Sequence, residues 1–137
     1  MNLWVKKLRL NLNENTLMKI IYFSDGQAID GLWHRLDMIT IFSDRSDTFI
    51  WLLESLLREG RIKLHKNGVF LESSIEDQIR LFKEAFPKDE HDADRICTKP
   101  GMEAPYEGFG MNVWWFLDSC PAGVAWRQDD GHYEIAD

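Results

Sequence analysis

Cysteine, proline and long apolar runs are all scarce in this chain of 137 residues, which holds 2 cysteines and 4 prolines. Two cysteines cannot build the disulfide framework of a small secreted domain. No apolar run approaches the roughly 20 residues that a membrane-spanning helix needs. The first residues also lack the apolar core of a secretory signal. We therefore expect a cytoplasmic protein that has no membrane association.

Acidic residues are concentrated in the second half of the chain. Residues 1–68 hold 10 basic and 8 acidic side chains, whereas residues 69–137 hold 6 basic and 15 acidic ones, giving net charges of +2 and -9. Such an acidic half disfavours sequence-general binding of nucleic acid, in which neutralised phosphates supply much of the affinity. It favours a basic protein partner, because complementary fields speed encounter. The simpler alternative is that the acidic surface keeps the protein soluble.

Apolar periodicity and capping residues predict a mainly helical α+β protein. Residues 1–13 are predicted to be an N-terminal extension or an edge strand, because Leu8, Leu10 and Leu12 alternate with polar residues, and residues 14–137 to be a single α+β domain. The first expected helix begins at an Asn13 or Asn15 cap and ends at Asp25-Gly26, and the second spans 27–36. The third runs from a Ser46-Asp47 cap to Gly60, and the fourth from Ser73 or Ser74 to Pro87.

A central β-hairpin is the strongest local prediction. Asn67-Gly68 separates two short alternating runs, 61–65 and 69–71, and a type I′ turn requires positive φ at both of its central residues. A short C-terminal β element is expected at 124–126, followed by a turn and the alternating Tyr133 and Ile135.

Residues 88–111 show no periodicity and are predicted to be irregular, which in a small domain is typical of a functional or mobile segment. The core resumes at 113–117. Adjacent residues of a strand point to opposite faces, so a strand here would expose either Trp114 or Trp115 as an interface anchor, whereas in a helix both could stay partly buried. The candidate partner-binding residues are Glu84, Asp89, Glu90, Asp92, Asp94, Trp114 and Trp115. The alternative for each acid is an ordinary solvated side chain.

No catalytic, cofactor-binding or metal-binding residues are predicted. The phosphate-binding glycine patterns are absent, and His91 with Asp92 and Asp94 is a close group too small for a metal site without further ligands. Cys120 precedes a proline in an apolar context, which favours a buried, unreactive thiol. We therefore expect a protein that is not an enzyme and needs no cofactor.

A winged-helix DNA-binding regulator is the alternative reading of the helix and hairpin. Five residues cluster around this turn, namely Arg58, Arg61, Lys63, His65 and Lys66. A wing can contact phosphates through such side chains. Acidic residues such as Glu59 and Glu72 lie close by, and the whole chain has a net charge of -7, so nucleic acid is the less favoured partner.

Several segments together resemble the bacterial domain-of-unknown-function family 596. They are 49–53, 60–64, 67–71 and 74–78, then Phe86-Pro87 and 120–126, with Asp25-Gly26 and Trp33 earlier in the chain. The resemblance covers about residues 14–127. No catalytic motif is carried over from it.

The resemblance implies a function as well as a fold. Members are similar to small proteins encoded beside polymorphic secreted toxins, as in contact-dependent growth inhibition. The resemblance therefore implies that this chain is an immunity protein. Such a protein would bind a basic toxin domain, expected to be a nuclease, and neutralise it by stoichiometric occlusion.

Overall fold

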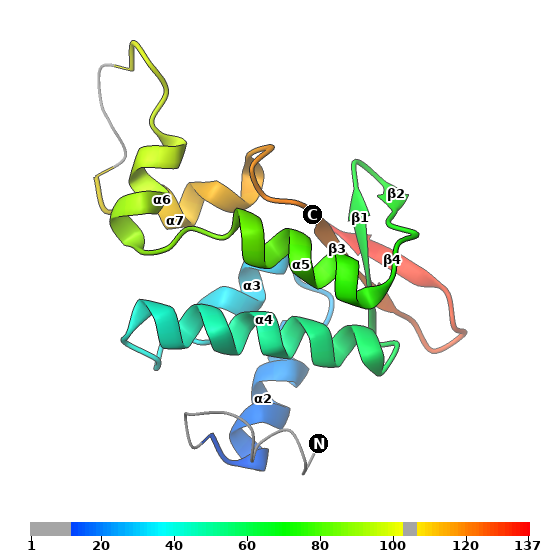
Figure 1. The fold of residues 1–137 in the computed structure, drawn as a ribbon. Helices are drawn as coiled ribbons and strands as arrows, with labels where there is room; N and C mark the ends of the chain where they lie inside the picture. Colours follow the sequence, from blue (N-terminus) through cyan, green and yellow to red (C-terminus); the bar gives the residue numbers. More distant parts are fainter. Residues whose placement is uncertain (1–11, 103–106) are drawn as a thin grey trace.

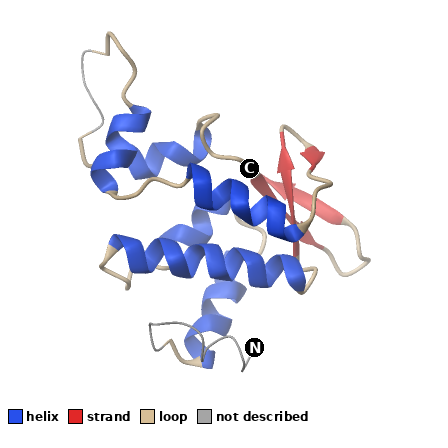
Figure 2. Ribbon diagram, in the orientation of Figure 1, coloured by secondary structure: helices blue, strands red, loops and turns tan. Residues whose placement is uncertain are grey.

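The computed structural model describes residues 12–102 and 107–137. Helices form most of the regular secondary structure, and a small sheet lies at one side of them (Figures 1 and 2). The elements are α2 (Glu14–Ser24), α3 (Ile29–His34), α4 (Phe42–Arg58), β1 (Ile62–Lys66), β2 (Val69–Phe70), α5 (Ile75–Ala85), α6 (Glu90–Cys97), α7 (Gly110–Val113), the 3-10 helix η1 (Trp114–Phe116), β3 (Gly123–Arg127) and β4 (Tyr133–Ala136). The predicted α+β class, mainly helical with a hairpin and a C-terminal β element, is confirmed.

Local capping explains where two of the helices begin. The Asn13 side chain accepts a hydrogen bond from the backbone N–H of Thr16 at 2.8 Å, and Ser74 accepts one from Asp77 at 3.1 Å. Each bond satisfies an N–H that lacks a partner in the first helical turn. Both caps match the sequence prediction. The expected edge strand in residues 1–13 falls almost wholly outside the described residues.

Helix α4 begins at Phe42, so the predicted Ser46-Asp47 cap is wrong. The Ser46 hydroxyl instead donates to the carbonyl of Ser43, one turn earlier in the same helix. The extra turn is held by tertiary contacts with Trp33: the Phe42 and Trp33 rings lie 5.3 Å apart, and the Arg45 guanidinium lies 4.2 Å from the centre of the indole. Arg45 also donates to the Trp33 carbonyl at 2.6 Å. A capping rule considers only neighbouring residues of the chain, so it does not detect these contacts with Trp33.

The four described strands form one antiparallel sheet in the order β2-β1-β3-β4. Asn67 and Gly68 have φ values of 52° and 84°, as the predicted turn between β1 and β2 requires. The C-terminal strands β3 and β4 form a second hairpin, and β3 pairs with β1. Trp126 donates its indole N–H to the Gln27 carbonyl at 2.8 Å, which joins the sheet to the start of α3.

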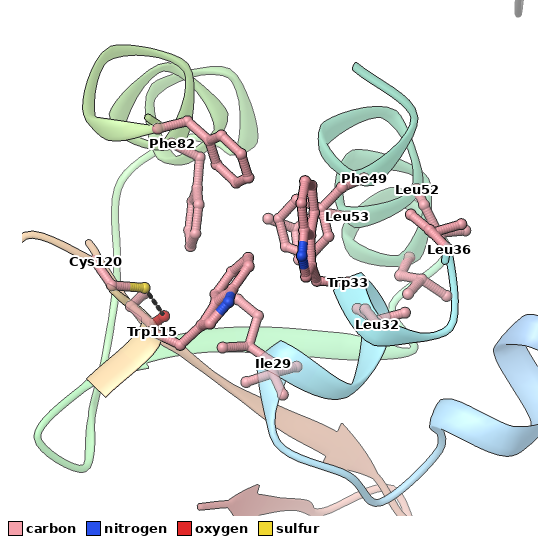
Figure 3. Close-up of a cluster of buried hydrophobic side chains, with 14 of the residues drawn as sticks. Ile29, Leu32, Trp33, Leu36, Phe49, Leu52, Leu53, Phe82, Trp115 and Cys120 are labelled. Atoms are coloured by element: carbon pink, nitrogen blue, oxygen red, sulfur yellow. Dashed lines mark hydrogen bonds between the residues drawn. The ribbon is translucent and has the colours of Figure 1, made fainter. Parts of the chain in front are cut away.

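The sheet and helices enclose a core rich in aromatic rings (Figure 3). Trp33 of α3, Phe49 of α4 and Trp115 of η1 point toward one another, with ring centres 5.1 to 6.1 Å apart. Trp114 is fully buried, and Trp115 is 7% exposed. The segment is helical and not a strand, so neither tryptophan leaves the core.

The prediction that residues 88–111 are irregular is wrong in part, because they contain α6 and the beginning of α7. Only Ala93 and Cys97 of α6 are fully buried. The apolar face of this helix consists of only Ala93, Ile96 and Cys97 in a highly charged segment, which is too short a pattern to predict a helix with certainty from the sequence.

Replacing Trp114 tests this assignment of the core. We expect Trp114→Ala to lower the free energy of unfolding by about 3–5 kcal/mol, because it empties a fully buried site. Phe116→Ala is the matched control, since Phe116 is 70% exposed, and should change stability by less than about 0.5 kcal/mol. Urea denaturation followed by circular dichroism measures both values. Equal losses for the two variants would contradict the assignment.

Candidate functional site

The acids predicted to bind a partner lie along α6 and at the end of α5, on the side of the molecule away from the β3–β4 hairpin (Figure 1). The capping of α6 uses two of them. Asp89 accepts a hydrogen bond from the Asp92 N–H at 2.7 Å, and the Asp92 carboxylate accepts one from the Lys88 N–H at 2.9 Å. Arg95 adds an ion pair to Asp92 at 2.8 Å. These bonds explain why a helix forms in so polar a segment.

The same bonds change the acidity of Asp92. The backbone N–H of Lys88, and after it the Arg95 guanidinium, lower the pKa of the Asp92 carboxyl below its usual range. Its carboxylate is therefore committed to holding the first turn of α6.

Asp94 binds the segment around Gly108 and Gly110 to helix α6. Its carboxylate accepts hydrogen bonds from the N–H groups of Gly108 and Gly110, both at 2.7 Å. A Cβ on Gly110 would lie 2.4 Å from the Asp94 nitrogen and 2.5 Å from the Ala93 carbonyl carbon, so only glycine allows this close approach. Phe109, between the two glycines, is 64% exposed. An aromatic ring is thus presented to solvent from a backbone held on both sides.

Glu84, Asp89 and Glu90 are the solvent-facing members of the predicted set. Glu84 and Glu90 form no hydrogen bond or salt bridge with any residue that the structure describes. The Glu90 charge acts on Arg45, without an ion pair. Asp89, Asp92 and Asp94 accept hydrogen bonds within the protein. The structure brings these acids together at one end of the molecule.

The predicted aromatic anchors do not lie on the surface. Trp114 and Trp115 are buried, so neither can contact a partner in this conformation. The exposed rings of the region are Phe109 and Phe116, 64% and 70% exposed, which the sequence reasoning missed. Phe109 could have been found from its position between two glycines, a pattern typical of a tightly turned backbone.

Neither cysteine has the surroundings of a nucleophile. Burial raises the pKa of the Cys120 thiol to about 11, and burial followed by the charge of Asp94 raises that of Cys97. Both side chains are buried, as predicted for Cys120. Within residues 12–102 and 107–137, no three His, Cys, Asp or Glu side chains are grouped so that they could hold a metal ion. None of the helices described is long and apolar enough to cross a membrane.

The basic residues near the β1–β2 turn are mostly engaged within the protein. Arg58 pairs with Glu54 at 2.8 Å and with Glu76 at 3.0 Å. Lys63 lies 4.6 Å from the ring centre of Tyr133, and Lys66 donates to the Cys120 carbonyl at 2.9 Å.

Of the other two residues of that group, Arg61 is also paired and His65 is buried. Arg61 pairs with Glu59 at 2.8 Å, and His65 is 6% exposed. A surface for binding phosphates needs cations without carboxylate partners. In this group, Arg58 and Arg61 are paired with carboxylates, so their charges are partly neutralised.

The chain belongs to the family described as "Protein of unknown function, DUF596", which matches residues 57–135. The resemblance to family 596 is therefore confirmed. The comparison with curated proteins gives no match.

One solved structure resembles this fold over nearly its whole length. It is an uncharacterised protein conserved in bacteria, from Neisseria meningitidis. It shares 21% sequence identity with this chain, and the two superimpose with a TM-score of 0.68. The superposition covers 96% of this chain and 91% of the Neisseria chain. At this identity the likeness concerns the fold alone.

Removing the Asp94 charge tests the attachment of the loop to α6. We expect Asp94→Asn to lower stability by about 1–3 kcal/mol, because two backbone N–H groups lose a charged acceptor. Exchange of the Gly108 and Gly110 amide hydrogens should accelerate, measured by NMR. Glu84→Gln is the control and should leave both readouts unchanged. Unchanged amide exchange in Asp94→Asn would show that the carboxylate does not hold the loop.

Asp92 predicts a pH dependence of stability. The pKa of the Asp92 carboxyl is lower in the folded than in the unfolded chain. Its contribution to the free energy of unfolding is therefore fully present above the pKa of the unfolded chain, near 3.8, and is lost as the pH falls through the lower pKa of the folded chain. Asp92→Asn should therefore be less stable than the parent protein at pH 7, and the difference should shrink below pH ~4. Urea denaturation at several pH values measures it. A difference that stays constant down to pH ~2 would rule out this linkage.

Proposed function

We propose that this chain is an immunity protein that binds a basic toxin domain and blocks it by stoichiometric occlusion in the cytoplasm. The observation that carries the proposal is the group of solvent-facing carboxylates at the α6 end, Glu84, Asp89 and Glu90. A toxin that cuts nucleic acid needs a basic cleft for phosphates, and carboxylates can occupy such a cleft in their place. The membership in family 596 supports the proposal through the resemblance of that family to toxin-associated proteins.

The acids divide into two roles under this proposal. Asp92 and Asp94 keep α6 and the following loop in place through the hydrogen bonds described above. Glu84, Asp89 and Glu90 supply the outward field that attracts a basic partner, and Asp89 also caps α6. A field from fixed positions speeds association more than it slows release, because it acts before contact is made.

Phe109 supplies the aromatic anchor that was expected of Trp114 or Trp115. It is 64% exposed and follows Gly108, whose N–H is bound to Asp94. A ring on a held backbone loses little conformational freedom on binding, which is the property of a good interface residue. The acidic end therefore combines charge for encounter with a ring for retention.

Occlusion needs no reactive group, and the two thiols agree with this. Both are buried, and burial raises the pKa of each above its usual value. That the protein acts without catalysis is a part of this proposal. The winged-helix alternative is less well supported, because the basic residues near its turn are engaged by carboxylates, rings or a carbonyl.

Co-expression with the toxin domain encoded beside its gene tests the function. Cells that produce that toxin domain should grow only when this protein is also present, and the two purified chains should form a 1:1 complex that weakens as salt rises. Failure to protect cells although both proteins are produced would exclude the immunity function. Binding to DNA without any complex with the toxin would favour the regulator.

Charge reversal locates the interface on the protein. We expect Glu84→Lys/Glu90→Lys to slow association with the toxin domain about tenfold or more at low salt, with a much smaller change in the dissociation rate. Stopped-flow fluorescence or surface plasmon resonance measures both rates.

The matched control is Glu72→Lys/Asp129→Lys, which changes the net charge by the same amount. Both of its residues are exposed, and neither is in α6: Glu72 lies between β2 and α5, and Asp129 between β3 and β4. Equal slowing by the two double variants would mean that only net charge matters and that α6 is not at the interface.

A further inference from the structure

Strand β4 forms one edge of the sheet and leaves that edge open. It is last in the order β2-β1-β3-β4, and β3 is the one described strand that it pairs with (Figure 1). The Gln128 N–H donates to the His132 carbonyl at 2.7 Å, which fixes the alternation of bonded pairs along the β3–β4 hairpin. The even-numbered residues of β4 therefore turn their main-chain groups toward β3, and Tyr133 and Ile135 turn theirs outward.

The outward groups of Tyr133 and Ile135 are hydrogen-bonding capacity that the described part of the chain leaves unused. The main-chain N–H and C=O of these two residues form no hydrogen bond with another described residue. A row of such groups at a sheet edge is a template for pairing with another strand. The other edge strand, β2, has two residues, and only Phe70 of the two turns outward.

The side chains of β4 determine which strand fits this edge. Tyr133 and Ile135 lie on one face of the sheet, where Ile135 is 40% exposed, and Glu134 lies on the other face and is exposed. Residues that are paired across two strands have their side chains on the same face. An added strand therefore places two residues beside Tyr133 and Ile135, and the residue between these two beside the Glu134 carboxylate.

The charge along β4 is negative. Residues 130–137 include Asp130, Glu134 and Asp137 and contain no lysine or arginine. His132 contacts Asp130 through one ring nitrogen, and its Nε2 lies 3.2 Å from a Glu134 oxygen. At most one positive charge thus accompanies three carboxylates. A lysine or arginine beside Glu134 is attracted, and an acidic residue there is repelled.

A second copy of β4 fits this edge poorly. The antiparallel register that uses all the outward groups pairs Tyr133 of each copy with Ile135 of the other. It places the two copies of Glu134 directly opposite each other on one face. Like charges in this position destabilise a pair of strands, so the occupant should be a different sequence with the opposite charge.

We propose that β4 binds an extended segment of another polypeptide, which adds to the sheet as an antiparallel strand and carries a lysine or arginine between two apolar residues. Its main chain bonds to Tyr133 and Ile135, and its basic side chain lies beside Glu134. Every described pair in this sheet is antiparallel, which the added strand continues. Such strand addition draws affinity from main-chain bonds and specificity from alternate side chains. The proposal is independent of the acidic residues at the α6 end.

Short blocked peptides test the edge in the full-length protein labelled with ¹⁵N. The basic peptide acetyl-Thr-Ile-Lys-Val-Thr-amide should shift the NMR signals of the amides at 133–136 and slow the exchange of the Ile135 amide hydrogen. The acidic peptide, with Glu in place of Lys, should bind about threefold or more weaker. The basic peptide methylated at its Ile and Val nitrogens should not bind, because it lacks the donors of a strand.

Three results of these titrations would overturn the proposal. They are equal binding of the acidic and basic peptides, undiminished binding of the methylated peptide, and no shift at 133–136 with the basic peptide at up to about 10 mM.

Ile135→Pro removes one outward N–H without removing a bond to β3, so this edge position tolerates proline. It should abolish binding of the basic peptide, whereas Ile135→Thr, which keeps the N–H, should retain binding. The indole N–H signal of Trp126, which is bonded to the Gln27 carbonyl, shows whether the sheet is preserved in each variant. Full binding by Ile135→Pro with this signal preserved would exclude strand addition at β4.

Glu134→Lys should reverse the charge preference, so that the acidic peptide binds about threefold or more tighter than the basic one. The matched control is Glu72→Lys, which makes the same change in net charge at an exposed position beside β2 and should keep the preference for the basic peptide. An unchanged preference in Glu134→Lys would contradict the role of Glu134.

Sedimentation equilibrium tests the second copy as occupant. The parent protein and Ile135→Pro should have the same oligomeric state. A dimer of the parent that Ile135→Pro dissociates would assign the edge to a second copy and overturn the proposal.

These outcomes are separable from those of the proposed function. If the edge proposal fails, the peptide titrations fail while the parent protein still protects cells from the toxin. If the immunity function fails, protection is lost while the basic peptide still shifts the signals of β4.

Discussion

The packing of Trp33 against Phe49, Phe86 and Trp115 is the interaction on which the rest of the structure depends. The ring centres of Trp33 lie 6.1, 5.5 and 6.0 Å from those of the other three. Each ring comes from a different segment: α3, α4, the end of α5 and η1. Aromatic contacts of this kind bury large areas and prefer tilted or edge-on geometry, so they determine relative orientation as well as proximity.

This cluster positions the acidic end of the molecule. Phe86 caps the end of α5, before the turn into α6, and Trp115 lies in η1, which follows α7, so both ends of the segment between them are anchored in the core. Asp94 then joins the two halves of the segment by accepting the N–H groups of Gly108 and Gly110. A polar helix with little apolar surface is in this way held rigidly at the surface. Rigidity of this kind is what a surface used for binding requires, because little order is then lost on association.

Local patterns predicted a large part of this architecture. The Asn67-Gly68 turn follows from the backbone conformations that those two residues tolerate, and the caps at Asn13 and Ser74 follow from side-chain oxygens within reach of the next turn. The errors have long-range causes. Helix α4 starts early because Phe42 and Arg45 contact Trp33, and α6 was missed because only three apolar residues of a short, charged segment pack against the core.

The sequence by itself determined the class of the fold, the hairpin, the acidic character of the second half and the residues available for a charged surface. These properties depend on composition and on neighbours within one or two turns. Only the tertiary structure decided which acids are exposed without a hydrogen bond to the described residues, as Glu84 is, and which are used internally, as Asp94 is. It also decided that Trp114 and Trp115 are buried while Phe109 is exposed, and that β4 lies at an edge of the sheet. The reason is that these outcomes depend on contacts between residues far apart in the chain, which no local pattern records.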